Sequence, residues 1–133
     1  MNTTKGITLH LLNTIVDGVE ETKIVAFEDR SFVGTVGLQY RGRVSARFRQ
    51  LYVAPESRLH GIGRRLVDCC CLIADSAGCE SIALQVTAKN RGLVEDFYSQ
   101  LGFIVSWEFS DGDLMLFKAL VKRDSVRMEG GAK

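Results

Sequence analysis

Residues 52–66 read Tyr-Val-Ala-Pro-Glu-Ser-Arg-Leu-His-Gly-Ile-Gly-Arg-Arg-Leu, and this segment decides the fold prediction. It joins an apolar strand, predicted over 44–53, to a helix that opens with Gly61 and Gly63. Glycine has no side chain to keep an anion away from the backbone. The first amides of a helix have no internal acceptor, and the helix dipole adds partial positive charge there. The segment therefore predicts a diphosphate-binding loop. Three arginines add full positive charge beside it: Arg58, Arg64 and Arg65.

Two other phosphate-binding loops do not fit this segment. A P-loop ends in Gly-Lys-Ser/Thr, whereas Gly63 is followed by two arginines. A dinucleotide-binding loop needs a third glycine where this chain has Leu66. What remains is Arg58-x-x-Gly61-x-Gly63, preceded by a strand that ends in Leu-Tyr-Val-x-Pro. This pattern resembles the acetyl-CoA loop of the GNAT superfamily of N-acetyltransferases.

A second segment carries the same resemblance. Residues 96–103 read Asp-Phe-Tyr-Ser-Gln-Leu-Gly-Phe, which is similar to the late GNAT signature of a helix that carries Phe-Tyr and ends in Leu-Gly-Phe. The apolar residues from Leu93 to Leu101 fall at helical spacing on one face. Gly102 suits a left-handed cap at the end of that helix. The resemblance covers about residues 43–120.

The order of elements predicts an α/β (α+β) fold with one domain over 1–120. Turn signals such as Asp17-Gly18 separate β-rich segments, and one long helix is predicted to run to about Ser76. The predicted strands cover 7–15, 22–27, 32–40, 44–53, 81–87, 103–109 and 114–120. The order is β-β-β-β-α-β-α-β-β, and the resemblance implies a mixed, mostly antiparallel sheet, flanked by helices and splayed between its fourth and fifth strands. The polar segment 121–133 is predicted to be a flexible tail.

The chain departs from the GNAT plan near its beginning. Most members place two helices between the first two strands, and these helices wall off the acceptor pocket. Only residues 16–21 stand in that place here, which is too short for two helices. We therefore expect a more open acceptor side. It would suit a protein amine, or a small amine, and a partner subunit in a homodimer could supply the missing wall.

The resemblance implies acetyl transfer from acetyl-CoA to a primary amine acceptor, by direct attack in a ternary complex. Tyr98 takes the position of the general acid that protonates the departing thiolate. Asn90 would contact the pantetheine arm, cap the next helix, or do both. The remaining cofactor-binding residues are backbone groups of the fourth strand and the glycine loop: Leu51, Tyr52, Val53, Arg58, Leu59, His60, Gly61, Ile62, Gly63 and Arg64.

No general base stands out in the sequence. Gln85 occupies the position where several branches that resemble this chain carry a glutamate, and an amide cannot act as a base. Glu28, Asp29 and His10 remain as distant candidates, although a lone histidine in a strand favours a structural role. We therefore expect ordered water and backbone carbonyls to remove the proton from the amine. Arg47 and Arg49 suit either a solvated strand face or recognition of an acidic acceptor.

Composition limits the remaining classes. The 133 residues are 46% hydrophobic and 25% charged with a net charge of +1, which is typical of a small globular domain and favours no membrane or nucleic-acid partner. No apolar run approaches the ~20 residues of a membrane span. Cys69, Cys70 and Cys71 project in different directions from a helix, so no metal site is expected. Four cysteines without a recognisable spacing predict a reducing, cytoplasmic location.

Two other function classes stay open. One is an acetyl-CoA sensor that has kept the cofactor and lost turnover; the missing glutamates favour it, and Tyr98 opposes it. The other is a nucleic-acid-binding module, suggested by the arginines at 41, 43, 47 and 49. No aromatic stacking pattern or recognition helix accompanies those arginines, so nucleic acid is the weakest of the three readings.

Overall fold

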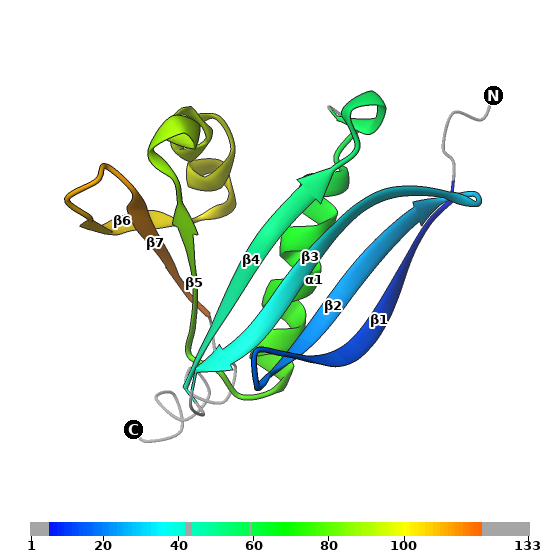
Figure 1. Ribbon diagram of the computed structural model, residues 1–133, viewed down its shortest axis with the longest axis horizontal. Coiled ribbons are helices and arrows are strands. Elements are labelled where there is room, and N and C mark those ends of the chain that lie inside the picture. The colour runs from blue at the N-terminus through cyan, green and yellow to red at the C-terminus, as the bar shows by residue number, and fades with distance from the viewer. Residues whose placement is uncertain (1–5, 42–43, 59, 121–133) are drawn as a thin grey trace, which may run out of the picture.

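The computed structural model describes residues 6–41, 44–58 and 60–120, and the predicted tail at 121–133 lies outside this part of the chain. Within it, a seven-stranded sheet has the order β1-β2-β3-β4-β5-β7-β6 (Figure 1). Only β4 and β5 pair in parallel among these strands. The predicted mixed, mostly antiparallel GNAT-like sheet is thereby confirmed. The strands are β1 (Ile7–Val16), β2 (Val19–Glu28), β3 (Ser31–Arg41), β4 (Ser45–Val53), β5 (Ser81–Val86), β6 (Ile104–Glu108) and β7 (Leu114–Ala119).

The helix α1 (Ile62–Ser76) packs against one face of the sheet and closes the core (Figure 1). Its buried positions recur at helical spacing, which is why the segment forms an amphipathic helix. Cys70 belongs to this buried stripe with 0% exposure, as predicted, and burial raises the pKa of its thiol far above the usual range. The helix residues Leu66, Val67, Cys70 and Ala74 share the core cluster with Ile24, Val36, Leu38 and Phe48 of the sheet.

The predicted second helix is present only as a series of short turns. These are η2 (Ala88–Asn90), the π-helical turn η3 (Val94–Tyr98) and η4 (Ser99–Leu101). The carbonyl of Val94 accepts from both the backbone N–H and the hydroxyl of Ser99, so the turn widens to π-helical geometry. Gly102 ends the series with φ 97°, which confirms the predicted left-handed cap.

β1 and β2 form a hairpin with no helix between them. Asp17 and Gly18 take φ values of 50° and 80°, as a two-residue turn between twisted strands requires. The shortened region predicted from the sequence is therefore real. Because α1 lies on the other side, the described residues leave one face of β1–β4 uncovered (Figure 1).

A bulge in β4 and a short β4–β5 ladder open the sheet. Gln50 has φ 57°, and Val36 of β3 faces both Gln50 and Leu51 because the register shifts there. β4 pairs with β5 only from Ser45↔Ser81 to Arg47↔Ala83, and beyond that point the two strands diverge. The splay was predicted, whereas the bulge was not.

Candidate active site

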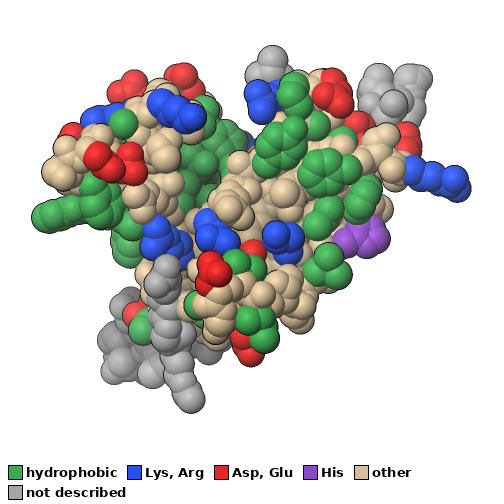
Figure 2. All heavy atoms as spheres, viewed as in Figure 1, with side chains coloured by type: hydrophobic (Ala, Val, Ile, Leu, Met, Phe, Trp, Pro, Cys, Tyr) green, Lys and Arg blue, Asp and Glu red, His purple; other side chains and the backbone are tan. Residues whose placement is uncertain are grey.

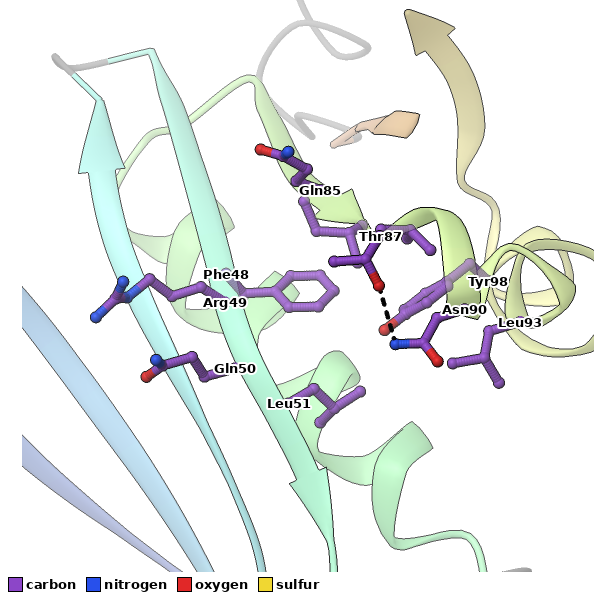
Figure 3. Close-up of a pocket in the computed structure, with 11 residues that line it drawn as sticks. Phe48, Arg49, Gln50, Leu51, Gln85, Thr87, Asn90, Leu93 and Tyr98 are labelled. Atoms are coloured by element: carbon purple, nitrogen blue, oxygen red, sulfur yellow. Dashed lines mark hydrogen bonds between the residues drawn. The ribbon is translucent and has the colours of Figure 1, made fainter. Parts of the chain in front are cut away.

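Two adjoining cavities occupy the splay between β4 and β5. The inner cavity, of about 240 Å³, lies between residues 48–51 of β4 and 84–87 at the end of β5. The outer cavity, of about 770 Å³, extends from there to the start of α1. They share Leu51, Asn90, Leu93 and Tyr98, so they lie side by side along the same wall. Figure 3 shows the residues that line the inner cavity. Figure 2 shows the surface hollowed between the two halves of the sheet.

The structure brings together ten of the twelve residues that the sequence singled out. They line the outer cavity: Leu51, Tyr52, Val53, Arg58, Gly61, Ile62, Gly63, Arg64, Asn90 and Tyr98. Leu59 lies outside the described residues. His60 is an exposed turn residue and lines neither cavity. Asp96, Phe97 and Gln100 line the same space and were not expected as site residues from the sequence. They belong to the irregular turns over residues 94–101, here called the Phe-Tyr segment.

The start of α1 has the properties of an anion site. Gly61 is the N-cap with φ 80°, and the first hydrogen bond of the helix runs from the N–H of Arg65 to its carbonyl at 3.1 Å. The amides before Arg65 therefore have no acceptor inside the helix. An added Cβ at Gly61 would meet nothing within 4 Å, whereas one at Gly63 would lie 3.4 Å from Phe97. Gly61 thus faces open space, and Gly63 lets the Phe-Tyr segment approach closely.

Arg58 and Arg64, the two arginines that line the outer cavity near the start of α1, make different polar contacts. The Nε of Arg58 donates to the carbonyl of Val53 at 3.0 Å, which anchors the side chain below the loop. Arg64 lies 3.8 Å from Asp68 in an exposed pair, which contributes little to stability. Both side chains therefore leave donors for an anion bound at the start of α1. The residues present fit a diphosphate.

Val53 directs a backbone N–H away from β3. The N–H of its neighbour Ala54 donates to Val33 of β3 at 2.9 Å, whereas the Val53 carbonyl accepts from Arg58 instead. In a strand, the N–H and C=O of one residue point to the same side, and successive residues alternate. The N–H of Val53 therefore points toward the outer cavity that this residue lines.

Tyr98 lies where the two cavities meet. Its ring is 5% exposed and packs against Phe48, Phe97 and Phe103, with ring centroids 4.9–6.3 Å apart. Its hydroxyl points into the splay (Figure 3). Burial raises the pKa of Tyr98 to about 12, so the hydroxyl keeps its proton at every physiological pH.

Asn90 ends η2 and does not cap the following turn, so that part of its prediction is wrong. Its side-chain amide donates to the hydroxyl of Thr87 at 3.2 Å, which holds it at the cavity wall near Tyr98 (Figure 3). The N-cap position of η3 belongs to Leu93. The reason is that Asn90 closes its own short turn, with its N–H bonded to the Thr87 carbonyl at 2.9 Å.

Gln85 links the two halves of the splayed sheet. Its carbonyl accepts from Arg47 at 2.9 Å, and its amide donates to Asp113 at 2.9 Å. The second oxygen of Asp113 accepts from the N–H of Ala88 at 2.9 Å. This chain of bonds fixes the end of β5 at the inner cavity. Asp113 was not found from the sequence, because no local pattern connects it with a residue 28 positions earlier.

A buried carboxylate on the uncovered face is a second feature that the sequence did not indicate. Glu21 is 2% exposed, and its Oε1 accepts from Arg49 at 2.9 Å and from Gln39 at 3.0 Å. Lys23 approaches Oε2 at 3.9 Å, too long for a hydrogen bond. Arg49 is therefore part of a fixed ion pair, and Arg47 is hydrogen-bonded to Gln85, so these arginines do not form a merely solvated strand face.

Sequence and structure comparisons assign the chain to a class. Residues 20–105 match the family model described as the acetyltransferase (GNAT) domain, which is more than half of the chain. The protein therefore belongs to the GNAT acetyltransferases, and this membership supports acyl transfer from coenzyme A as its general activity. None of the curated protein sequences compared with the chain matches it.

Solved structures agree with the family. Ard1 from Thermoplasma volcanium is 22% identical with a TM-score of 0.68, covering 75% of this chain and 71% of its own. PaiA N-acetyltransferase from Thermoplasma acidophilum, solved with coenzyme A, is 26% identical with a TM-score of 0.66, covering 73% and 59%. An aminoglycoside 6'-acetyltransferase of type Ii is 23% identical with a TM-score of 0.67, covering 77% and 71%.

The described residues contain neither a metal cluster nor a membrane-spanning helix. No group of three or more His, Cys, Asp or Glu side chains there is arranged to hold a metal ion. Among the same residues, no helix has the length and apolar character needed to cross a membrane.

Proposed function

We propose that the protein transfers the acetyl group of acetyl-CoA to a primary amine by direct attack in a ternary complex. The observation that carries the proposal is a pair of adjoining cavities, with the free amides at the start of α1 on the outer one and Tyr98 where the two meet. β4, α1 and the Phe-Tyr segment, which are far apart in the sequence, all contribute walls to it.

The chain's own groups would hold the cofactor in a defined order. The free amides at the start of α1, with Arg58 and Arg64, would bind the diphosphate. The backbone of Leu51–Val53 would pair with the amides of the pantetheine arm, as an added strand pairs with a sheet edge. When bound, acetyl-CoA supplies an activated thioester carbonyl. Its fit here is supported by the divergence of β4 from β5, which leaves that edge of β4 without a strand partner.

Three groups would then serve the transfer. The N–H of Val53, or that of a neighbouring residue of β4 where Val53 pairs with the pantetheine arm, would donate to the oxyanion of the tetrahedral intermediate. Ordered water and backbone carbonyls would take the proton from the attacking amine, because no Asp, Glu or His side chain of the described residues lines the inner cavity. Tyr98, in the position of the general acid, would donate a hydrogen bond to the departing sulfur.

The pKa of Tyr98 defines how this acid would work. A thiol with an ordinary pKa near ~8.5 is a stronger acid than a tyrosine whose pKa is raised to about 12. Complete proton transfer to a free thiolate would cost about 5 kcal/mol, at ~1.4 kcal/mol for each pKa unit. The hydroxyl would therefore act mainly as a hydrogen-bond donor while the C–S bond breaks.

The test is acetyl transfer to a panel of amines, measured by chromatography of the coenzyme A released. We expect turnover by the wild-type chain and a loss of about 10²–10⁴-fold in kcat for Tyr98→Phe. Cofactor affinity, measured by calorimetry, should stay within about twofold because the ring is kept. An unchanged rate in Tyr98→Phe would remove this residue as the acid and leave the acyltransfer proposal standing.

An acetyl-CoA sensor without turnover is the second candidate. It is favoured by one observation, namely Gln85 and its amide-mediated bonds at the position where a carboxylate base would be useful. Tight cofactor binding with no acetyl transfer to any amine or to water would support the sensor. Since the four cysteines are free thiols, we place either activity in the reducing cytoplasm.

A further inference from the structure

The face of β1–β4 opposite α1 carries more apolar and charged surface than the binding of a small amine would require. We name it the open face and define it by the side chains that alternate away from the core. They are Thr8, His10, Leu12, Thr14, Glu21, Lys23, Val25, Phe27, Phe32, Thr35, Gly37, Gln39, Arg47, Arg49 and Tyr52. Figure 2 views this face and shows hydrophobic side chains gathered beside a row of Lys and Arg side chains.

Four rings form an aromatic row across the open face: Tyr52, Phe32, Phe27 and His10. Tyr52 also lines the outer cavity. Successive ring centroids are 6.2, 6.4 and 5.3 Å apart from Tyr52 to His10. At about 3.3 Å per residue, an extended segment of about five residues would follow this row. Its far end opens into a hollow of about 530 Å³, lined in part by Leu12, Val25 and Phe27.

The aromatic row is accessible although it is apolar. Phe32 is 45% exposed and Tyr52 is 43% exposed, so both rings present faces or edges to solvent. No described segment of the chain lies over them, because the loop between β1 and β2 is a two-residue turn. A contiguous exposed apolar surface next to a reaction site indicates a contact with another molecule.

The charged cluster of Glu21, Lys23 and Arg49 lies beside the aromatic row and presents positive charge. Lys23 and Arg49 are 40% and 34% exposed at the side chain, whereas Glu21 is 1% exposed. Two cations thus share one carboxylate, for a net charge of +1. Only the Nε of Arg49 has a partner among the described residues, so its terminal nitrogens can bind an anion. Lys23 lies two residues from Val25, a step of about 7 Å along β2.

On the basis of the acetyl transfer proposed above, we infer that the acceptor is the amine of an extended polypeptide segment. Its apolar side chains lie on the aromatic row, and an acidic side chain near the amine binds Lys23 and Arg49. The length of the aromatic row favours a polypeptide acceptor over a small amine, because a small amine would reach only Tyr52. The positive charge of the cluster favours an acidic residue in that polypeptide. A net charge of this size is too low to bind a nucleic-acid backbone.

The experiment compares five-residue peptides with free N-terminal amines and apolar residues at positions four and five. Each has Glu, Gln or Lys at position two, and kcat/KM is measured for each by release of coenzyme A. The wild-type chain should prefer Glu over Gln by about fivefold, the value of one partly exposed ion pair. Lys23→Glu should abolish or invert that preference, so that the Lys peptide becomes the better acceptor. Phe32→Ser should raise KM about fivefold for every peptide.

Matched controls separate the open face from general effects of charge and polarity. Leu72→Ser removes an apolar side chain that is 68% exposed on α1, away from the open face. Lys89→Glu reverses an exposed charge that lines neither cavity. Both control variants should rank the three peptides by kcat/KM in the same order as the wild-type chain. All four variants should bind acetyl-CoA with wild-type affinity in calorimetry.

The outcomes distinguish this inference from the activity on which it depends. Equal kcat/KM for the Glu, Gln and Lys peptides, or small amines that exceed every peptide, would overturn the inference and leave acetyl transfer intact. Retention of labelled DNA or RNA by the wild-type chain, weakened by Lys23→Glu, would also overturn it. Failure to acetylate any amine, with normal cofactor binding, would refute the proposed function itself.

Discussion

At Gly37 of β3, a single added methyl group would meet the buried carboxylate of Glu21. A Cβ added there would lie 2.7 Å from the Cδ and Oε2 of Glu21 and 3.0 Å from its Oε1. The backbone at Gly37 is not in the left-handed region, so alanine is excluded by the carboxylate alone. In Gly37→Ala, the Glu21 carboxylate must therefore shift, and because it is buried and hydrogen-bonded, the shift disturbs its contacts.

The cost follows from the contacts that Glu21 would lose. It would give up a hydrogen bond of 2.9 Å to Arg49 and one of 3.0 Å to Gln39. Bonds to a charged group contribute about 1.5–3 kcal/mol, and partial exposure of Arg49 reduces the value of this pair. Replacing a strand glycine returns about 0.5–1 kcal/mol. We expect Gly37→Ala to lower the free energy of unfolding by about 2 kcal/mol.

Urea unfolding followed by circular dichroism measures this loss. Gly92→Ala is the matched control, because its Cβ would meet nothing within 4 Å. In a Glu21→Ala background the obstacle is gone, so Gly37→Ala should cost nothing there. A loss below about 0.5 kcal/mol in the single variant, or an equal loss in both backgrounds, would refute the steric argument.

Three further predictions concern the cavities and the core. Gly61→Leu should weaken acetyl-CoA binding at least tenfold in calorimetry, because its φ of 80° disfavours a side chain and the new group would enter the space at the start of α1; unchanged affinity would contradict the loop assignment. Because the pKa of Tyr98 is raised to about 12, kcat should show no descending limb near pH 10, and a limb lost in Tyr98→Phe would contradict this. The thiol of Cys70, with 0% exposure and a raised pKa, should resist alkylation in mass spectrometry until the chain unfolds, and rapid labelling of the folded protein would count against its burial.

Local patterns were enough to predict the parts of the site that are continuous in the sequence. The glycines at 61 and 102 were expected at helix boundaries, and both take positive φ there. The Asp17-Gly18 turn was expected from two adjacent residues and fixes the register of the first hairpin. In each case the conformation is set by residues within one turn, so a short segment contains the necessary information.

The features that were missed depend on contacts between distant residues. Arg49 and Glu21 are 28 positions apart, and Arg47 and Gln85 are 38 positions apart. Their pairing follows from the strand order and register, which no local pattern specifies. The left-handed conformation of Gln50 was missed for the same reason, because it arises where the register between β4 and β3 shifts. A glutamine in the sequence gives no sign of such a conformation.

These distant contacts connect the open face with the part of β4 that lines the outer cavity. Arg49 immediately precedes Gln50, so the buried carboxylate of Glu21 holds β4 at the residue before the strand bulges. Beyond the bulge, Leu51 and Val53 line the outer cavity. Gly37 gives Glu21 the room to reach across β3, which makes a glycine in a neighbouring strand part of the support of the site. The described chain joins β1 to β2 by a two-residue turn without helices, and within the sheet the Arg49–Glu21 ion pair links β4 to β2. The same pair uses only the Nε of Arg49, so under the proposed function one contact would both hold the strand that binds the cofactor and leave positive charge for the acceptor.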